Sequence, residues 1–410
     1  MEVLGVLSFR SMEGEPISIA LLTSKDSIED SKVEFLLRII GSSTSRSKIN
    51  IVYAIDASKS MDGERLFFAK HAALKSLEYL ETGDGLTVIR FCRKSEVVFG
   101  PSRIDDEKVR KEAVRRIAAI KTCPGTNIEA ALIDSISAAK NMISEFGGIG
   151  VIVLITDGEP NFGERDPDKL RNLIKRYVGS SPITITTVGV GSEYNEKLLS
   201  KISEAGGGVL EHVSDIVDID KPITREVLRA AKVVAANVKA IIRISEGARV
   251  NIYGWDYTEN NDVIEVNIGT VAANEVIEVP GEFILDDESL PSGELDVRVS
   301  YVDPLTQRTW WRGSLVVRLN RGPASSTNSF VSYKVSLFKS LDEIKRAIEK
   351  KDYSKALELI AGAAETTMTL GDTSLHEKTV DIASLLEKGM VEEASKRLFS
   401  LATEIRREQE

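Results

Sequence analysis

From about residue 48 to residue 213, short apolar stretches alternate with longer stretches whose apolar residues recur at helical spacing. The stretch "GVIVLITDG" (150–158) is apolar at almost every position before its polar end, which is typical of a strand buried on both faces. Within 63–81 the apolar side chains share one helix face, at Leu66, Ala69, Ala73, Leu77 and Leu80. Repeated strand–helix units of this kind predict an α/β fold with a mostly parallel, doubly wound sheet that carries helices on both faces.

Strand-like stretches flank this α/β segment on both sides. Residues 3–40 contain three short stretches rich in β-branched residues, and six more follow between about 236 and 320. Three strands are too few to bury a core of their own, and six strands leave open sheet edges. We therefore predict that both segments build one β-sandwich, all-β in character, into which the α/β domain is inserted.

The last part of the sequence has the pattern of four amphipathic helices, with breaks at "KKDY" and "KGM". This predicts a C-terminal, all-α domain of two helical hairpins. The predicted division assigns 1–44 to the N-terminal strands of the sandwich and 45–225 to the α/β domain. The remainder of the sandwich is then 226–320, a linker is 321–329, and the helical domain is 330–410.

Charge and cysteine usage exclude several classes of function. The net charge of -10 argues against broad binding of nucleic acid or of an anionic membrane, because both need a surplus of Lys and Arg. No apolar stretch approaches the ~18–20 residues of a membrane span, and the N-terminus lacks the pattern of a signal peptide. Two cysteines, Cys92 and Cys123, are too few for a disulfide framework, so we expect small buried apolar residues in a reducing compartment. These features predict a cytoplasmic protein.

Polar side chains gather where three elements of the predicted sheet reach its carboxyl edge. Asp56, Ser58 and Ser60 follow the strand "INIVYAI", Thr126 begins a helix, and Asp157 ends the strand at 150–156. Doubly wound sheets bind ligands at this edge. Two carboxylates and three hydroxyls, with no His or Cys, are hard oxygen ligands that suit Mg²⁺ or Mn²⁺. We expect Ser102, Glu159 and Asn161 to line the same face.

Each part of this set also has a purely structural interpretation. Thr126 with Glu129 has the spacing of a capping box, which needs no metal. The "DASKS" stretch (56–60) alone is compatible with an Asx or Ser turn before a helix, and "TDG" alone is a common turn. The metal interpretation depends on all five side chains converging at one edge.

Catalysis is not indicated. None of the three histidines, His71, His212 and His376, is expected to act as a catalytic base: His71 lies within a helical stretch and His376 on the predicted C-terminal helices. The sequence has no Ser-His-Asp order, no phosphate-binding Gly-Lys loop and no paired cysteines of a redox motif. A metal here is therefore expected to hold a partner rather than to perform chemistry, and the protein is not expected to be an enzyme.

The five residues resemble the metal-ion-dependent adhesion site (MIDAS) of von Willebrand factor A (vWA) domains. The DxSxS motif of that family is present as "DASKS", followed by Thr126 and Asp157 in the family's order, and the resemblance covers about 48–222. It implies direct hydroxyl ligands from Ser58 and Ser60, and a Thr126 ligand that is direct or water-separated. It also implies that Asp56 and Asp157 act largely through bound water. One coordination position would stay open for an acidic residue of a protein partner.

The layout of an A domain inserted in a sandwich and followed by helices resembles the Sec23/Sec24 coat proteins. It also resembles archaeal ArnB-type regulators, which partner a forkhead-associated (FHA) domain protein, repress motility (archaellum) genes and are substrates of Ser/Thr kinases. FHA domains read phosphothreonine, often with an acid three positions on. Thr369 has Asp372 at that spacing, so Thr369, Thr366 and Thr367, on an expected mobile segment between helices (366–374), are phosphorylation candidates. The stretch "SSTNS" (325–329) is the rival.

Three functions compete at this point. The leading prediction is a metal-dependent protein–protein interaction module that acts as a regulator or scaffold. The alternative is a vWA adaptor subunit for an AAA+ ATPase or chelatase-type machine, which would share the metal site. A metal-dependent phosphoesterase is the third, but the sequence offers neither a base nor a nucleophile for it.

Overall fold

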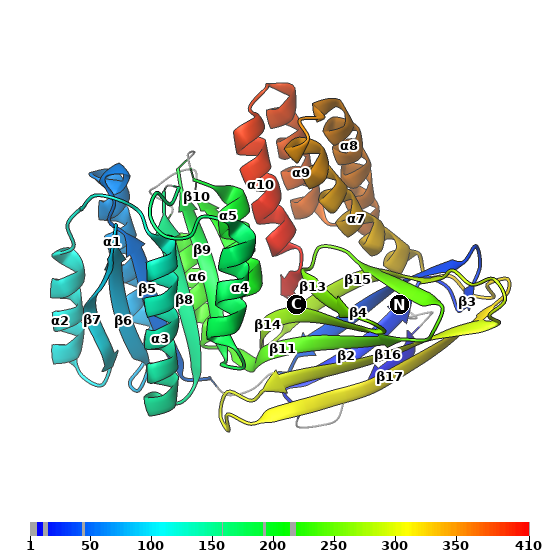
Figure 1. Cartoon of the computed structure of the whole chain (residues 1–410), viewed down its shortest axis with the longest axis horizontal. Helices are drawn as coiled ribbons and strands as arrows, with labels where there is room; N and C mark the ends of the chain where they lie inside the picture. Colours follow the sequence, from blue (N-terminus) through cyan, green and yellow to red (C-terminus); the bar gives the residue numbers. More distant parts are fainter. Residues whose placement is uncertain are drawn as a thin grey trace. The chain divides into compact units, whose positions relative to one another are not determined.

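The computed structural model describes residues 6–10, 15–42, 46–157, 159–191, 194–213 and 219–409 (Figure 1). The chain divides into two compact units. The α/β unit comprises Ser43–Asn237 and Val302–Thr309. The sandwich–helix unit comprises Met1–Ser42, Val238–Tyr301 and Trp310–Glu410. Within the described residues, no helix has both the length and the apolar content needed to cross a membrane.

The α/β unit contains a six-stranded sheet in the order β10-β9-β8-β5-β6-β7. Its strands are β5 (Ile49–Asp56), β6 (Gly85–Phe91), β7 (Ser95–Arg103), β8 (Ile149–Thr156), β9 (Ile183–Val190) and β10 (Gly207–Val213). All neighbouring pairs are parallel except β6 and β7, which form an antiparallel edge. Every residue of β5, β8 and β9 is buried, as their apolar sequences predict.

Helices cover both faces of this sheet, as a doubly wound fold requires. They are α1 (Glu64–Ser76), α2 (Glu107–Ala118), α3 (Ile128–Phe146), α4 (Pro167–Val178), α5 (Glu196–Ala205) and α6 (Asp220–Ala230). Two short 3₁₀ helices, η1 (Lys59–Met61) and η2 (Leu77–Tyr79), flank α1. On one face α1 contacts both α2 and α6, while α3 and α5 contact the strands from the other face (Figure 1).

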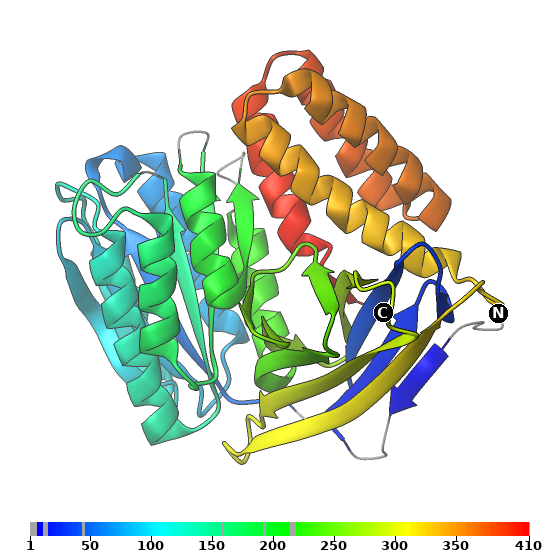
Figure 2. The same ribbon diagram turned by 45° about the vertical axis from the view of Figure 1, so that its right-hand side comes forward.

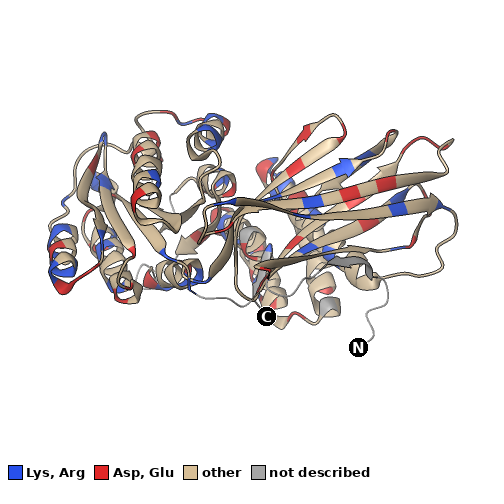
Figure 3. Cartoon of the chain, turned by 90° about the horizontal axis from the view of Figure 1, so that it is seen from below, with Lys and Arg blue, Asp and Glu red and all other residues tan. Residues whose placement is uncertain are grey.

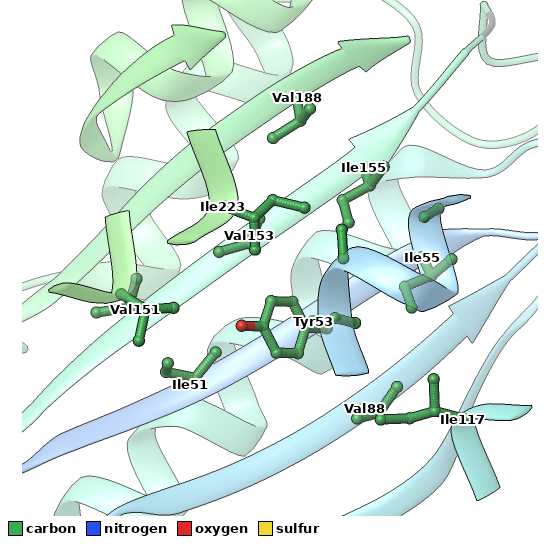
Figure 4. Close-up of a cluster of buried hydrophobic side chains, with 14 of the residues drawn as sticks. Ile51, Tyr53, Ile55, Val88, Ile117, Val151, Val153, Ile155, Val188 and Ile223 are labelled. Atoms are coloured by element: carbon green, nitrogen blue, oxygen red, sulfur yellow. The ribbon is translucent and has the colours of Figure 1, made fainter. Parts of the chain in front are cut away.

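The core on the α1 face is built from the alternate side chains of the central strands. Figure 4 shows Tyr53 of β5 among side chains of β6 and β8, closed over by Ile117 of α2 and Ile223 of α6. The Tyr53 side chain is fully buried, and its hydroxyl shares a hydrogen bond with the Ser76 hydroxyl at the end of α1. Burying the phenol without this partner would leave an unsatisfied polar group, so Ser76 supports the packing.

The sandwich is made from two six-stranded sheets. One has the order β1-β2-β4-β15-β12 with β18 beside β15, and the other has the order β13-β14-β11-β16-β17-β3. The strands are β1 (Val6–Arg10), β2 (Ile17–Thr23), β3 (Ser27–Ile28), β4 (Lys32–Gly41), β11 (Val233–Ile244), β12 (Ala248–Ile252), β13 (Tyr257–Asn260), β14 (Val263–Ala272), β15 (Glu275–Leu285), β16 (Ser292–Val302), β17 (Thr309–Arg321) and β18 (Arg407–Gln409).

Strands from both sides of the α/β segment share one sheet. The N-terminal β4 pairs antiparallel with β15 along a register that runs from Ile40 opposite Val276 to Lys32 opposite Ile284. The prediction of a single sandwich interrupted by the α/β domain is therefore confirmed. A nine-residue register of this kind satisfies the backbone of both strands and leaves neither as an open edge.

Four helices complete the sandwich–helix unit (Figure 2). They are α7 (Ser329–Glu349), α8 (Tyr353–Leu370), α9 (Thr373–Glu387) and α10 (Val391–Glu404). Helix α7 contacts both α8 and α10, so the four helices close on themselves around a shared apolar core. Left-handed residues end three of them, Lys351, Gly371 and Gly389. After α10 the chain forms β18, which the helical sequence pattern did not indicate.

Ion pairs fasten α7 to the sandwich. The fully buried carboxylate of Glu278 on β15 lies 3.2 Å from Arg38 of β4 and 2.9 Å from Lys334 of α7. Glu282, also on β15, accepts hydrogen bonds from Tyr253 at 2.6 Å and from Lys339 of α7 at 3.0 Å. Elsewhere basic and acidic residues are interspersed along the strands and helices (Figure 3).

Candidate metal-binding site of the α/β unit

Asp56 is the last residue of β5, and its carboxylate is held from two sides. Oδ1 accepts the backbone N–H of Ser58 at 2.8 Å, and Oδ2 accepts the hydroxyl of Thr156 at 2.6 Å. The first of these bonds forms the Asx turn that the sequence allows. Burial raises the pKa of Asp56 to about 6, against the hydrogen bonds from Thr156 and Ser58, and the nearby Asp157 charge adds to the rise. A cation at this position would stabilise the ionised form.

A chain of hydroxyls connects this loop to the end of β8. The Ser58 and Ser60 hydroxyl oxygens are 2.9 Å apart, and the Ser60 hydroxyl donates to Oδ1 of Asp157 at 2.8 Å. Asp56, Ser58 and Asp157 are buried, whereas Ser60 is exposed. Four of the five side chains predicted from the sequence therefore share one hydrogen-bonded network at the carboxyl edge of the sheet.

Thr126 is held by the loop that follows β8, the strand whose end carries Asp157. Its N–H donates to Oδ1 of Asn161 at 2.8 Å, and its carbonyl accepts the N–H groups of Asn161 and Phe162. Thr126 is buried, and both polar groups of its backbone are bonded to Asn161.

The capping-box interpretation of Thr126 is wrong. The N-cap of α3 is Asn127, whose side chain accepts the N–H of Ala130 at 3.0 Å. Glu129 instead accepts the N–H of Glu164 at 3.0 Å. Asn is as good an N-cap as Thr, so the helix begins one residue later than the spacing suggests. Thr126 is thereby released from a capping role.

Arg65 is a functional candidate that the sequence reasoning missed. It lies in the first turn of α1, and its guanidinium pairs with Oδ2 of Asp157 and lies 3.4 Å from the carbonyl of Ser60. Asp157 therefore presents one oxygen to Ser60 and the other to Arg65. A cation is disfavoured in the first turn of a helix by the helix dipole, and this unusual placement is a signal that the sequence contained.

The donor set fits a hard divalent cation. Among the described residues, no cluster of three or more His, Cys, Asp or Glu side chains is arranged to hold a metal. Any ion at this edge would therefore depend on the hydroxyls of Ser58, Ser60 and Thr126 as well as on the two carboxylates. Oxygen-only ligands with few charges are the coordination that Mg²⁺ and Mn²⁺ accept.

Comparison with protein families identifies the α/β unit. The von Willebrand factor type A domain matches residues 50–225. These residues are a vWA domain. The uncharacterized protein YfbK of Escherichia coli is similar to the chain, with 27% identity over 277 residues. This match covers 64% of the chain and 47% of YfbK, so the chain spans about half the length of that relative.

Solved structures extend the likeness beyond the vWA domain. A von Willebrand factor type A protein from Catenulispora acidiphila superposes with a TM-score of 0.73 over 90% of this chain and 91% of its own, at 16% identity. The ArnB paralog VWA2 from Sulfolobus acidocaldarius superposes with a TM-score of 0.68 over 96% of this chain and 98% of its own, at 20% identity. Human Sec24c, a COPII-coat protein, gives 0.56 over 91% of this chain and 60% of its own, at 14% identity. At these identities the likeness shows the fold alone.

The expectation for the cysteines is wrong. Cys92 and Cys123 form a disulfide, with their Cα atoms 5.9 Å apart. Cys92 follows β6 of the vWA domain and Cys123 precedes Thr126, and both segments end at the same sheet edge. The sequence separation of 31 hides this proximity, and a reducing compartment no longer follows from the cysteines.

The structure places the three residues expected to line the site, Ser102, Glu159 and Asn161, differently. Asn161 supports Thr126, and the exposed Glu159 accepts a hydrogen bond from Asn195 at 3.2 Å. Ser102 is a wrong assignment, because it pairs with Leu86 near the start of β6, whereas Asp56 pairs with Phe91 at the end of β6. The antiparallel direction of β7 carries Ser102 to the opposite edge of the vWA sheet.

The histidines lie outside the hydrogen-bonded network of the candidate site. His71 stacks on Phe67 along α1, with ring centroids 6.3 Å apart. His212 lies on β10 and shares a 2.8 Å hydrogen bond with the hydroxyl of Tyr194. His376 lies on α9, 3.0 Å from the carbonyl of Ala364.

The threonines proposed as phosphorylation candidates lie in a helix, so the expected mobile segment at 366–374 is wrong. Helix α8 extends to Leu370, and its hydroxyls bond to carbonyls of the preceding turn, Thr366 to Gly362 at 2.9 Å and Thr369 to Glu365 at 3.0 Å. Thr367 is fully buried, whereas Thr369 is exposed. Asp372, the acid at the recognition spacing, is the N-cap of α9.

Proposed function

We propose that the vWA domain binds one divalent cation, Mg²⁺ or Mn²⁺, and through it holds an acidic residue of a protein partner without catalysing a reaction. The observation that carries the proposal is the hydrogen-bonded series from Asp56 through Ser58 and Ser60 to Asp157 at the carboxyl edge of the sheet. Thr126 is the fifth residue, buried and bonded to Asn161 of the loop that follows Asp157. These five residues would hold the cation, which when bound would supply a positive charge for a partner's carboxylate.

Arg65 changes the charge of the site that a partner would meet. Two carboxylates and one guanidinium carry a net charge of −1, and a divalent cation would change that sum to +1. A cation and two carboxylates alone would cancel, leaving little attraction for an acid. The Arg65–Asp157 pair therefore supports an anionic partner over a neutral or cationic one.

The finer part of the proposal is the biological setting. We propose a cytoplasmic regulator or scaffold that a Ser/Thr kinase phosphorylates, that an FHA-domain partner reads, and that represses motility genes. Two observations support it. The fold matches that of the ArnB paralog VWA2 over nearly the whole of both chains. Thr369 is exposed near the end of α8, where phosphate would meet solvent.

Calorimetric titration of the full chain with Mg²⁺ tests the metal site. We expect one ion per chain, and we expect Ser60→Ala to weaken binding by about tenfold or more, because it removes a ligand without disturbing the ion pair of Asp157. Asp105→Asn, a change at an exposed carboxylate outside the network, is the matched control and should bind as the parent does. Absence of Mg²⁺ and Mn²⁺ uptake by the parent chain would overturn the proposal.

Affinity purification with and without a chelator tests the partner. An FHA-domain protein that is lost after phosphatase treatment would support the regulator. Recovery of an AAA+ ATPase would favour the adaptor alternative instead. Hydrolysis of a generic phosphoester by the parent chain, abolished in Asp56→Ala, would contradict the non-catalytic role.

A further inference from the structure

We propose that thiol–disulfide exchange at Cys92–Cys123 controls the order of the loop that carries Thr126, and through it the affinity of the metal site. The inference rests on the proposed function for its second half, the metal affinity. Its first half, the order of residues 123–127, depends only on the described contacts. We call residues 123–127 the Thr126 loop.

The disulfide joins the Thr126 loop to the end of a central strand. Cys92 directly follows Phe91, the last residue of β6, and Cys123 lies three residues before Thr126. Two further bonds cross the same gap: the N–H of Arg93 donates to the carbonyl of Pro124 at 3.2 Å, and the side-chain amide of Asn127 donates to the carbonyl of Arg93 at 3.2 Å. Both hydrogen bonds are near the long end of the normal range, so the covalent bond is the strong connection here.

The same loop is connected to the DxSxS motif through a single residue. The N–H of Cys123 donates to the carbonyl of Ala57 at 2.8 Å, and the N–H of Ala57 donates to the carbonyl of Phe91 at 2.9 Å. Ala57 lies between Asp56 and Ser58. The disulfide and these two hydrogen bonds therefore connect β6, the DxSxS motif and the Thr126 loop in a closed ring of contacts. This ring fixes the ligand-bearing segments relative to one another.

The opposite side of the Thr126 loop is held by contacts other than the disulfide. Thr126 is bonded to Asn161, and Gly125 lies against the ring of Phe162. A Cβ on Gly125 would come within 2.6 Å of that ring, and its φ of +88° is one that other residues rarely adopt. Opening the disulfide should therefore loosen one side of the loop while the other side and the sheet stay folded.

The two sulfurs differ in access, which sets the order of the exchange. Cys92 is 3% exposed, whereas Cys123 is partly exposed and packs at the margin of the core. The thiolate of an external dithiol attacks Sγ of Cys123, the S–S bond breaks, and Cys92 leaves as a thiolate that takes up a proton. The second thiol of the dithiol then releases Cys123 as a thiol. Two electrons and two protons pass to the protein, and the dithiol leaves as a disulfide.

Two measurements on the full chain, oxidised and dithiothreitol-reduced, test the proposal. Hydrogen exchange without metal should show faster exchange of the Arg93 and Cys123 amides in the reduced chain. Mg²⁺ titration should show about tenfold weaker binding in the reduced chain, the scale expected when support of a ligand is lost. Reoxidation should restore both values. A Cys92→Ala/Cys123→Ala variant should have the same exchange rates and Mg²⁺ affinity as the reduced parent, and dithiothreitol should change neither.

The outcomes separate this inference from the metal proposal. Equal exchange and equal Mg²⁺ affinity in the two redox forms overturn the inference while leaving the metal site intact. Absence of Mg²⁺ uptake in the oxidised chain overturns the metal proposal, and the exchange data then decide the loop's dependence on the disulfide by themselves. If the double variant does not fold, the reversible reduction of the parent chain still gives both measurements.

Discussion

Asp84 is the buried carboxylate on which the start of the vWA domain depends, and its replacement by Ala is the most quantitative prediction. Its oxygens accept hydrogen bonds from the guanidinium of Arg46 at 3.0 and 2.6 Å. They also accept the N–H of Ile49, the first residue of β5, at 3.2 Å and the N–H of Glu81 at 2.8 Å. The hydrogen bond to Asp84 raises the pKa of Arg46, so the guanidinium stays charged.

The cost of Asp84→Ala follows from what it leaves behind. The N–H of Ile49 is buried and would lose an acceptor, at about 1–3 kcal/mol. Arg46 is 27% exposed and can regain water, so the loss of its paired bonds adds only about 1–2 kcal/mol. We expect the free energy of unfolding of the vWA domain to fall by about 2–5 kcal/mol, and by about half of that in Asp84→Asn, which keeps one acceptor oxygen.

Urea unfolding of the full chain, followed by hydrogen exchange, measures this effect. Exchange should accelerate at the amides of β5 and β6 and should be unchanged in the strands of the sandwich. Asp105→Asn serves again as the control, because its side chain is exposed. A loss below about 1 kcal/mol in Asp84→Ala, or a loss located in the sandwich strands, would refute the reasoning.

Three further predictions concern the sandwich–helix unit. Burial opposes the ionisation of Glu282, but hydrogen bonds hold its pKa at about 2, below the unfolded value. The stabilisation by the ionised Glu282 is therefore present at pH 7 and is lost as the pH falls from about 4 toward 2. Thermal unfolding should show that Glu282→Gln is less stable than the parent at pH 7 and indistinguishable from it near pH 2. Lys334→Met removes a cation from the buried carboxylate of Glu278 and should cost about 3 kcal/mol in chemical denaturation, part of which a second change, Glu278→Gln, should recover. Kinase labelling followed by mass spectrometry should find phosphate on Thr369 and none on the fully buried Thr367.

Much of the fold was predictable because buried strands and helix faces require apolar residues at characteristic positions in the sequence. The apolar runs of β5 and β8 can be satisfied only inside a covered parallel sheet, and the structure buries every residue of both. The split sandwich followed from counting strands that could not bury a core alone, and the pairing of β4 with β15 confirms it. These inferences depend on the average character of a stretch and not on any single contact.

The errors arose where a single contact decides the outcome. The Cys92–Cys123 bond depends on two turns meeting above the sheet, which no local pattern reports. Ser102 was misplaced because a hairpin reverses the direction of β7, and the sequence of a strand does not reveal its direction. Thr366, Thr367 and Thr369 were expected in a mobile segment between helices, but they continue α8, and their hydroxyls bond back to its carbonyls.

Arg65 shows how such a contact bears on the proposed metal-dependent function. A cation in the first turn of α1 is disfavoured by roughly 0.3–1 kcal/mol through the helix dipole, and its ion pair with Asp157 offsets this cost. The pair also decides which state of the site is electrically balanced. With the proposed divalent cation bound, the site would carry +1, and one carboxylate from a partner would bring the sum to zero, which favours association because the contact face loses its water. Without Arg65 the same complex would carry −1 and would oppose the partner. On this reasoning the site is complete only when metal and partner acid are both bound, so a chelator and the loss of the partner's acid should release the complex to the same extent.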